Sequence, residues 1–132
     1  MIFLTRFEVA VVQRLLSGPE EPVGVLRRQL EVAIPVHREQ TPTGFYIDFF
    51  VSSNVEAVTN NASFAFGDVT AQIDGLMFGA GFLVHVKDGF LSQIEGFSYG
   101  EEWPGNVSSY TLAIDENLAE RKQDTLREVL RH

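Results

Sequence analysis

The sequence predicts an α+β fold: an N-terminal helical hairpin, an antiparallel sheet of about five to six strands and a C-terminal helix, in a single domain of residues 1–132. Three observations predict it. Apolar residues recur every three to four positions near both ends of the chain, which is typical of amphipathic helices. The Phe- and Gly-rich centre contains short β-type segments separated by turns. Strands grouped together between helices favour an antiparallel sheet.

Two helices are expected at the N-terminus. The first spans residues 2–16 and has an apolar stripe that includes Phe3 and Phe7. The second begins near Pro22 and ends before Ile34, because proline suits a first helical turn and a residue that precedes proline avoids helical angles. The connection between them is short, so we expect an antiparallel pair that packs on the sheet.

Six segments of the centre have strand character, and Leu76–Val86, which is apolar on both faces, is the expected central strand. The segments are Gly44–Val51, Ser63–Phe66, Val69–Asp74, Leu76–Val86, Phe90–Tyr99 and Val107–Ile114. The segment around His37 can be a short strand or a loop. A final helix begins at the capping cluster of residues 115–117 and runs towards Leu130.

The turn at residues 87–89 joins the two longest strands, and its length sets their register. A two-residue turn places Glu95 opposite Phe82, whereas a three-residue loop makes one face nearly all apolar. The hydrophobic pattern therefore favours the three-residue loop. In that register His85, Leu91 and Glu95 share the other face, but His85 and Glu95 lie roughly 13 Å apart, at ~3.3 Å per residue. That distance excludes a direct hydrogen bond.

Composition limits the classes of function. The chain has no cysteine, so disulfides and thiolate metal sites are excluded. Its net charge of −8 disfavours a broad nucleic-acid interface. The longest apolar run is too short to cross a membrane, and no secretory signal pattern is visible, so the expected compartment is the cytoplasm. No histidine or carboxylate spacing predicts a metal or other cofactor.

The negative charge is concentrated in the centre of the chain. Residues 40–110 carry eight acidic residues and one base, Lys87, for a net charge of −7. An acidic surface attracts basic partners and accelerates their association. This distribution favours a protein partner that is itself basic.

An enzyme has weaker support. His85 is a candidate base, with Asp48 or Glu95 as the acid that orients it. The alternative is a half-buried strand histidine without a chemical role. The sequence has no cysteine and no serine in a nucleophile turn, and the glycines at 79 and 81 lack the third glycine of a dinucleotide-binding loop. We therefore predict no catalytic residues.

The turn that follows the strand Phe90–Tyr99 is the best candidate for a binding site. Tyr99, Glu101, Glu102 and Trp103 combine aromatic and acidic side chains in a loop bounded by glycines. Aromatic residues on loops of a rigid sheet are typical of binding sites. Two placements are open for Trp103: it either contacts the partner or folds back to cap the edge of the core.

The same region carries a resemblance. The stretch from Leu91-Ser92-Gln93-Ile94-Glu95 through Glu102-Trp103-Pro104 resembles a pattern in small uncharacterised bacterial proteins. Some of those proteins resemble immunity proteins, which neutralise toxins in competition between bacteria. The resemblance covers residues 83–104 and implies a bacterial binding protein without catalytic residues.

Three functions are compatible with these observations. The first is a non-enzymatic acidic binding protein, an immunity-type inhibitor of a basic toxin or enzyme. The second is a small-molecule-binding or enzymatic domain with a cavity between a curved sheet and the helices, on the side of Asp48, His85 and Glu95. The leading helices and Phe-lined sheet are similar to the nuclear-transport-factor-2-like fold, which implies such a cavity. The third is a structural homo-oligomer that pairs through an exposed strand or an apolar face.

Overall fold

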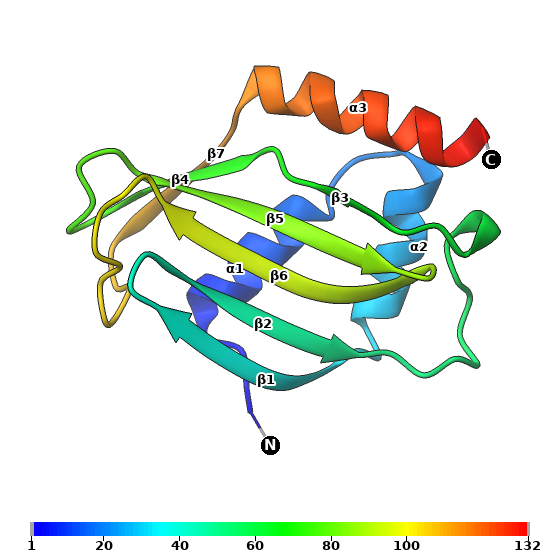
Figure 1. The fold of residues 1–132 in the computed structure, drawn as a ribbon, viewed down its shortest axis with the longest axis horizontal. Helices are drawn as coiled ribbons and strands as arrows, with labels where there is room; N and C mark the ends of the chain where they lie inside the picture. Colours follow the sequence, from blue (N-terminus) through cyan, green and yellow to red (C-terminus); the bar gives the residue numbers. More distant parts are fainter. Residues whose placement is uncertain (1, 132) are drawn as a thin grey trace.

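The computed structural model describes residues 2–131 and confirms the α+β class. Two N-terminal helices precede seven antiparallel strands, and a third helix follows them (Figure 1). The helices are α1 (Arg6–Leu15), α2 (Glu21–Leu30) and α3 (Glu116–Arg131), with a short 3-10 turn η1 (Thr59–Asn61). The strands are β1 (Ile34–Thr41), β2 (Gly44–Phe50), β3 (Phe64–Phe66), β4 (Val69–Ile73), β5 (Ala80–Lys87), β6 (Phe90–Ser98) and β7 (Tyr110–Ile114).

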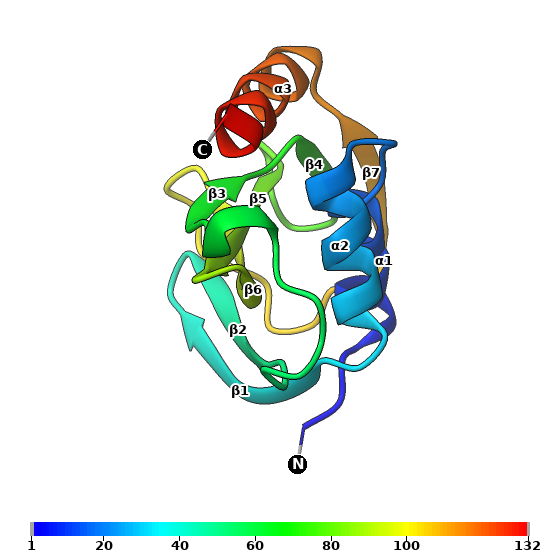
Figure 2. The same ribbon diagram turned by 90° about the vertical axis from the view of Figure 1, so that its right-hand side faces the viewer.

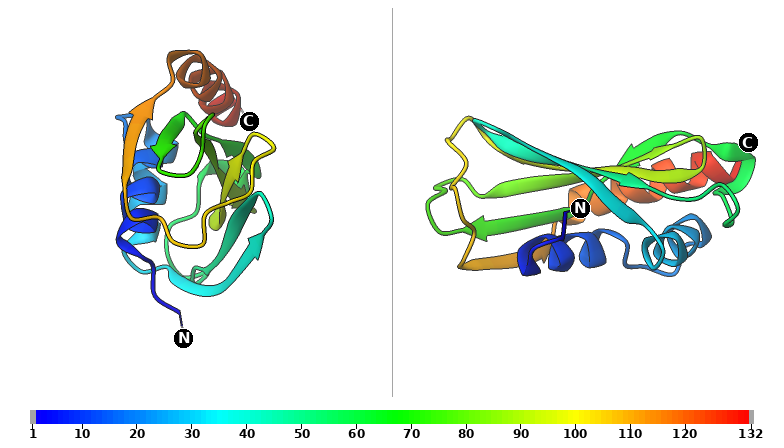
Figure 3. Two further views of the ribbon diagram at one scale, coloured as in Figure 1. Left: turned by 90° about the vertical axis from the view of Figure 1, so that its left-hand side faces the viewer. Right: turned by 90° about the horizontal axis from the view of Figure 1, so that it is seen from below.

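The strands form one curved sheet in the order β1-β2-β6-β5-β4-β7, and β3 pairs with β5 beside β4. The sheet curls partly around α1 and α2, which lie along its inner face (Figure 2). Helix α1 packs on β4 and β5, and α2 packs on β6. The view from below shows the strong twist of the sheet and the two helices following each other along it (Figure 3). The expected antiparallel packing of the two helices against each other is therefore wrong: each packs on its own strands of the sheet. The core lies between these two layers.

Helix α1 begins later than the sequence predicts, and its start explains why. Thr5 caps the helix: its hydroxyl accepts from Glu8 N at 3.1 Å, and Glu8 Oε1 accepts from Thr5 N at 2.8 Å. This reciprocal pair of bonds fixes the first turn at Arg6. The prediction that Phe3 belongs to the apolar stripe is therefore wrong: it precedes the helix and is exposed, whereas Phe7 is buried.

Strand β1 is the element that the sequence located least well. Buried and exposed residues alternate poorly along β1, because it is an edge strand with an irregularity between Pro35 and His37.

The side chain of Arg38 connects β1 to the start of α1. Arg38 Nε lies 2.9 Å from Glu8 Oε2, and Arg38 Nη2 donates to Glu8 Oε1 and to the carbonyl of Phe3. This bidentate hydrogen bond to Glu8 raises the pKa of Arg38 and holds β1 against the start of α1.

The predicted register of the β5–β6 hairpin is wrong. The turn has two residues, Asp88 and Gly89, both with positive φ, and Lys87 pairs with Phe90. Beyond the turn, the register shifts by one residue at Ser92, so that neither of the two simple registers applies to the whole hairpin. A β-bulge of this kind reverses which face each residue occupies. Leu91 accordingly points into the core instead of sharing a face with Glu95.

Gln29 of α2 completes this hairpin with a buried side chain. Its Nε2 donates to the carbonyls of Gly89 and Glu56, both at 2.9 Å, and its Oε1 accepts from Leu91 N at 2.8 Å. Strand β2 stops pairing with β6 at Gln93, so no strand partner reaches Leu91 N on that side. The amide of Gln29 takes the place of that partner.

Helix α3 is anchored by a buried lysine. Lys122 is 4% exposed, and its Nζ lies 3.0 Å from the carbonyl of Ser17, 3.3 Å from that of Leu15 and 3.4 Å from Asp68 Oδ2. The ammonium also lies 5.4 Å from the centre of the Phe66 ring. These contacts join the C-terminal helix to the end of α1 and to the segment between β3 and β4.

Candidate functional site

Two loops meet at one end of the sheet, at the left in Figure 1, and expose large apolar side chains. The β4–β5 loop contributes Met77 and Phe78, which are 79% and 65% exposed, and the residue after β6, Tyr99, is 54% exposed. Contiguous exposed apolar groups mark interaction sites more often than scattered ones do. We call Met77, Phe78, Tyr99, Glu101 and Glu102 the binding tip.

Glu101 holds the binding tip together. Its Oε1 accepts from Met77 N at 2.8 Å, and its Oε2 accepts from Phe78 N at 2.9 Å. The carbonyl of Glu101 accepts from the hydroxyl of Ser98 at the end of β6. Hydrogen bonds to an ionised carboxylate are about twice as strong as neutral ones. These bonds therefore fix the two loops relative to each other.

The aromatic side of the binding tip rests on the sheet. The rings of Phe97 and Tyr99 pack edge to face, with centroids 5.8 Å apart. Both lie over Gly81: a Cβ at that position would come within 2.7 Å of the Phe97 ring and 3.0 Å of the Tyr99 hydroxyl. The glycine in this strand thus allows the close approach of two aromatic rings. Tyr99 is therefore exposed, but its ring rests on the ring of Phe97.

Trp103 adopts the second of its two possible placements. It is 9% exposed, and its ring packs edge to face on Phe45 at 5.4 Å. Its backbone N donates to the carbonyl of Pro42 at 2.8 Å, which fixes the β6–β7 connection to the β1–β2 turn. Trp103 is thus part of the core beneath the binding tip rather than a contact surface.

We expect the fluorescence of this protein to report that burial. Trp103 is the only tryptophan in the chain. Its emission should be shifted to the blue in the native state and should resist quenching by iodide. Denaturation in urea should move the emission to the red and restore quenching. A native spectrum already centred at the position of free indole in water would contradict the placement of Trp103 in the core.

The charge around the binding tip is negative. Residues 74–79 and 99–105 contain Asp74, Glu101 and Glu102 and no basic residue. Asp74 and Glu102 are exposed, whereas Glu101 is half-buried by its hydrogen bonds to the neighbouring loop. The surface therefore combines apolar side chains with exposed carboxylates.

The second group of predicted residues meets on the opposite face of the sheet from the helices. His85 Nε2 lies 3.0 Å from Glu95 Oε1, and Asp48 Oδ1 accepts from Gln93 Nε2 at 2.8 Å. The predicted separation of His85 and Glu95 is therefore wrong, and the bulge at Ser92 is the reason: it shifts Glu95 to a position diagonal to His85.

These residues do not line a space between the sheet and the helices. Asp48, His85 and Glu95 are half-exposed on the outer face, and the pockets that the structure shows are lined by other residues. On the inner face, side chains from α1, β2 and β6 close the gap to less than the size of a water molecule. The outer group is a hydrogen-bonded surface network without the enclosure that catalytic sites use.

Tyr46 belongs to this network, and we expect a specific pH response from it. The negative charge of Glu95 raises the pKa of Tyr46 above its ordinary value, because a nearby carboxylate disfavours the phenolate. Glu95→Gln should therefore lower the pKa of Tyr46, measured by the pH titration of its ring-carbon NMR signal. Asp48→Asn is the matched control and should leave that titration unchanged. An equal shift in both variants would contradict the pairing of Tyr46 with Glu95.

No protein-family model, no curated protein and no solved structure matches this chain. Within residues 2–131, no three histidine or carboxylate side chains converge as a metal site requires. None of the helices in that range combines the length and the apolar character needed to cross a membrane.

Sequence reasoning named Tyr99, Glu101 and Glu102 as candidate binding residues but did not name Met77 and Phe78, which the structure places beside them. Both lie in the apolar run that was expected to be one long strand from Leu76, whereas β5 begins at Ala80. Gly75 and Gly79, which have positive φ, bound the loop on both sides. Those two glycines were the signal that residues 76–78 form a turn rather than the start of a strand.

Proposed function

We propose that this protein is a non-enzymatic binding protein of the bacterial cytoplasm whose protein partner docks on the binding tip. The observation that carries the proposal is the pair of hydrogen bonds that the Glu101 carboxylate accepts from Met77 N and Phe78 N. It fixes the backbones of the two loops relative to each other, and so the positions from which their exposed apolar side chains project. Loops that are ordered before binding lose less entropy when a partner contacts them.

The chemistry of the binding tip selects the kind of partner. Met77, Phe78 and Tyr99 require an apolar pocket, and Asp74 and Glu102 favour basic residues around it. An anionic membrane surface would be repelled by these carboxylates, so a protein is the better occupant. An immunity-type inhibitor of a basic toxin or enzyme fits this combination.

Capture with matched variants tests the proposal. Lysate of the encoding organism is passed over the wild-type protein, Met77→Asp/Phe78→Asp, and the control Ile34→Asp. Ile34 is also about half exposed but lies in β1. We expect a basic protein to bind the wild type and the control and to bind the tip variant at least about 30-fold more weakly, because central apolar contacts contribute 2 kcal/mol or more. Equal capture by all three proteins would contradict the proposal.

Association with that partner should depend on salt. Raising the ionic strength from ~0.05 to ~0.5 M shortens the screening length from about 14 to about 4 Å, so long-range attraction fades. We expect the association rate to fall while the dissociation rate changes little. Glu102→Lys is the appropriate charge variant because Glu102 is exposed. Reversing the charge at Glu101, in contrast, would also break the hydrogen bonds that hold the β4–β5 loop. An association rate that does not change with salt would remove the electrostatic part of the proposal.

A structural homo-oligomer is the second candidate, because Ile34 and Phe50 form an exposed apolar cross-strand pair at the β1 edge. Edge strands with apolar side chains are typical sites of self-association. Light scattering tests this function: Ile34→Asp should convert a dimer to a monomer, and the tip variant should not. A wild-type protein that is monomeric at high concentration would exclude it.

A further inference from the structure

The inner face of the sheet opens into a small cleft at the end where Trp103 lies. The cleft is enclosed by the start of α1, the β1–β2 hairpin near its turn and the connection from β6 to β7, and it holds about 130 Å³. Its floor contains the buried rings of Phe7, Phe45 and Trp103, and its rim contains the exposed amides of Gln40 and Asn106. We call it the aromatic cleft.

The rings at the floor pack on one another. Phe45 lies between the other two and packs edge to face on both, with its ring centroid 6.5 Å from that of Phe7 and 5.4 Å from that of Trp103. The Phe45 ring lies directly over Gly96, where a Cβ would overlap it. Trp103 is held by the hydrogen bond from its backbone N to Pro42. Backbone contacts thus hold two of the three rings in position.

The volume of the aromatic cleft limits its ligand to a single ring. Drug-sized ligands occupy sites of about 300–1,000 Å³. A cavity of about 150 Å³ lined by apolar side chains, in contrast, binds benzene. The aromatic cleft is close to the second value. A ring that enters it can pack edge to face on the floor, as the rings of the floor already do with one another.

The charge in the aromatic cleft is already paired. Among the described residues, Glu8 is the only ionisable one that lines the cleft, and both of its oxygens are in use. Oε1 accepts from Thr5 N and from Arg38 Nη2, and Oε2 accepts from Arg38 Nε. This ion pair leaves no charge for a cationic or anionic ligand to neutralise. A neutral ligand therefore fits best.

The amides at the rim are free to bond to a ligand. Within residues 2–131, neither the Gln40 nor the Asn106 side chain makes a hydrogen bond. Each amide carries a carbonyl that accepts and two N–H groups that donate. A hydroxyl both donates and accepts, so it is a neutral group that can bond to both amides.

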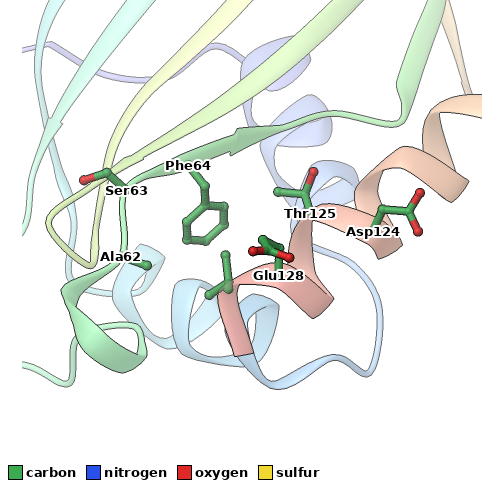
Figure 4. A pocket seen from close by; sticks show the side chains of 7 residues that line it. Ala62, Ser63, Phe64, Asp124, Thr125 and Glu128 are labelled. Carbon is green, nitrogen blue, oxygen red and sulfur yellow. The ribbon is translucent and has the colours of Figure 1, made fainter. Parts of the chain in front are cut away.

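A larger pocket between β3 and α3 offers a ligand less (Figure 4). It holds about 430 Å³, but the two carboxylates of its lining are paired with arginines of their own helix. Asp124 lies 3.2 Å from Arg127, and Glu128 lies 3.4 Å from Arg131. Apolar contact with Phe64 remains, and such contact does not select one ligand over another. The smaller cleft has the more specific chemistry.

We propose that the aromatic cleft binds a phenol, a neutral single aromatic ring that carries a hydroxyl. The ring packs on Phe45 and Trp103 at the floor, and the hydroxyl bonds to the amides of Gln40 and Asn106 at the rim. Free phenolic molecules and tyrosine side chains share this chemistry. The cleft is separate from the binding tip, and its ligand does not depend on the proposed function.

NMR titration of the isotope-labelled full chain with p-cresol tests this proposal. Trp103 is the only tryptophan, so its indole N–H gives a single signal of that kind. We expect p-cresol to shift this signal and the backbone signals of Asn106 and Val107 in a saturable way. The expected Kd is about 1 mM or lower, as is usual for a ligand with so few atoms. N-acetyltyrosinamide that binds equally well would identify a tyrosine side chain as the occupant, and binding of p-cresol alone would identify a free phenol.

Two analogues test the hydroxyl and the neutrality of the ligand. Toluene lacks the hydroxyl and should bind at least about fivefold more weakly, which is the effect of one ordinary hydrogen bond. Benzylammonium carries a charge that the paired Glu8 does not neutralise, and it should be weaker than p-cresol by at least the same factor.

Variants at the rim locate the hydroxyl. Gln40→Met combined with Asn106→Leu removes both amides at exposed positions and nearly keeps the side-chain size. This double variant should bind p-cresol at least about fivefold more weakly but should bind toluene as the wild type does. Gln13→Met, at an exposed position of α1 outside the cleft, is the matched control and should change neither affinity.

Melting curves confirm that the variants are folded, and the two single variants replace the double variant if it is not. A Trp103 signal that does not respond to p-cresol would overturn the proposal. Toluene or benzylammonium that binds as tightly as p-cresol would also overturn it, as would an unchanged affinity for p-cresol after loss of the amides.

Discussion

Lys122→Met is expected to destabilise the protein by about 3–5 kcal/mol, because it leaves a buried carboxylate without its ion-pair partner. Asp68 is as buried as Lys122, and its second oxygen, Oδ1, has no hydrogen-bond partner among residues 2–131. The substitution also removes the donor to the carbonyls of Leu15 and Ser17. Urea denaturation followed by circular dichroism measures the loss.

Two further variants separate the ion pair from the packing of α3. Arg121→Met changes the exposed neighbour and should alter the free energy of unfolding by less than about 0.5 kcal/mol. Lys122→Met combined with Asp68→Asn should be more stable than Lys122→Met alone, because the double variant buries no unpaired charge. If the double variant loses as much stability as the sum of its parts, the buried pair is not the cause.

Phe7→Ala is expected to destabilise the protein by about 3–5 kcal/mol, the usual loss for a buried aromatic residue. The Phe7 ring packs edge to face on Tyr110 at 4.9 Å and on Phe82 at 5.9 Å, so it joins α1 to β5 and β7. Truncation leaves a cavity where the helix layer meets two strands. The midpoint of urea denaturation should fall accordingly.

Phe3→Ala is the matched control, since Phe3 lies one helical turn before Phe7 in the sequence but is exposed. We expect it to change the free energy of unfolding by less than about 0.5 kcal/mol. Equal losses in the two variants would mean that α1 extends to residue 3 and packs along its whole length.

The order of helices and strands was predictable because it depends on local patterns. The stretch of aromatic and β-branched residues in β2 and the capping residue at the start of α3 are visible in the sequence. The start of α1 was less predictable, because the Thr5–Glu8 bonds compete with an apolar stripe that continues to Phe3. Strand β1 was hardest, because an edge strand is stabilised by its neighbour β2 and by the Arg38–Glu8 pair rather than by its own pattern.

The candidate site was predictable only where one segment carries it. Tyr99 and Glu102 follow each other in the chain, so composition alone indicated a binding loop. Met77 and Phe78 join them through a hydrogen bond that spans more than twenty residues, which no local pattern reveals. The separation of His85 from Glu95 failed for a related reason: a single extra residue at 92 changes the register of everything beyond it.

The pairing of the β5–β6 hairpin also constrains how the sequence can change over evolution. Next to a two-residue turn, the second pair of residues does not exchange hydrogen bonds, so Leu91 N, opposite Val86, points away from β5 and towards Gln29. A homologue whose β2 reached far enough to pair with residue 91 would satisfy that N–H with a carbonyl and would not need a glutamine at position 29. The length of β2 and the residue at position 29 should therefore vary together.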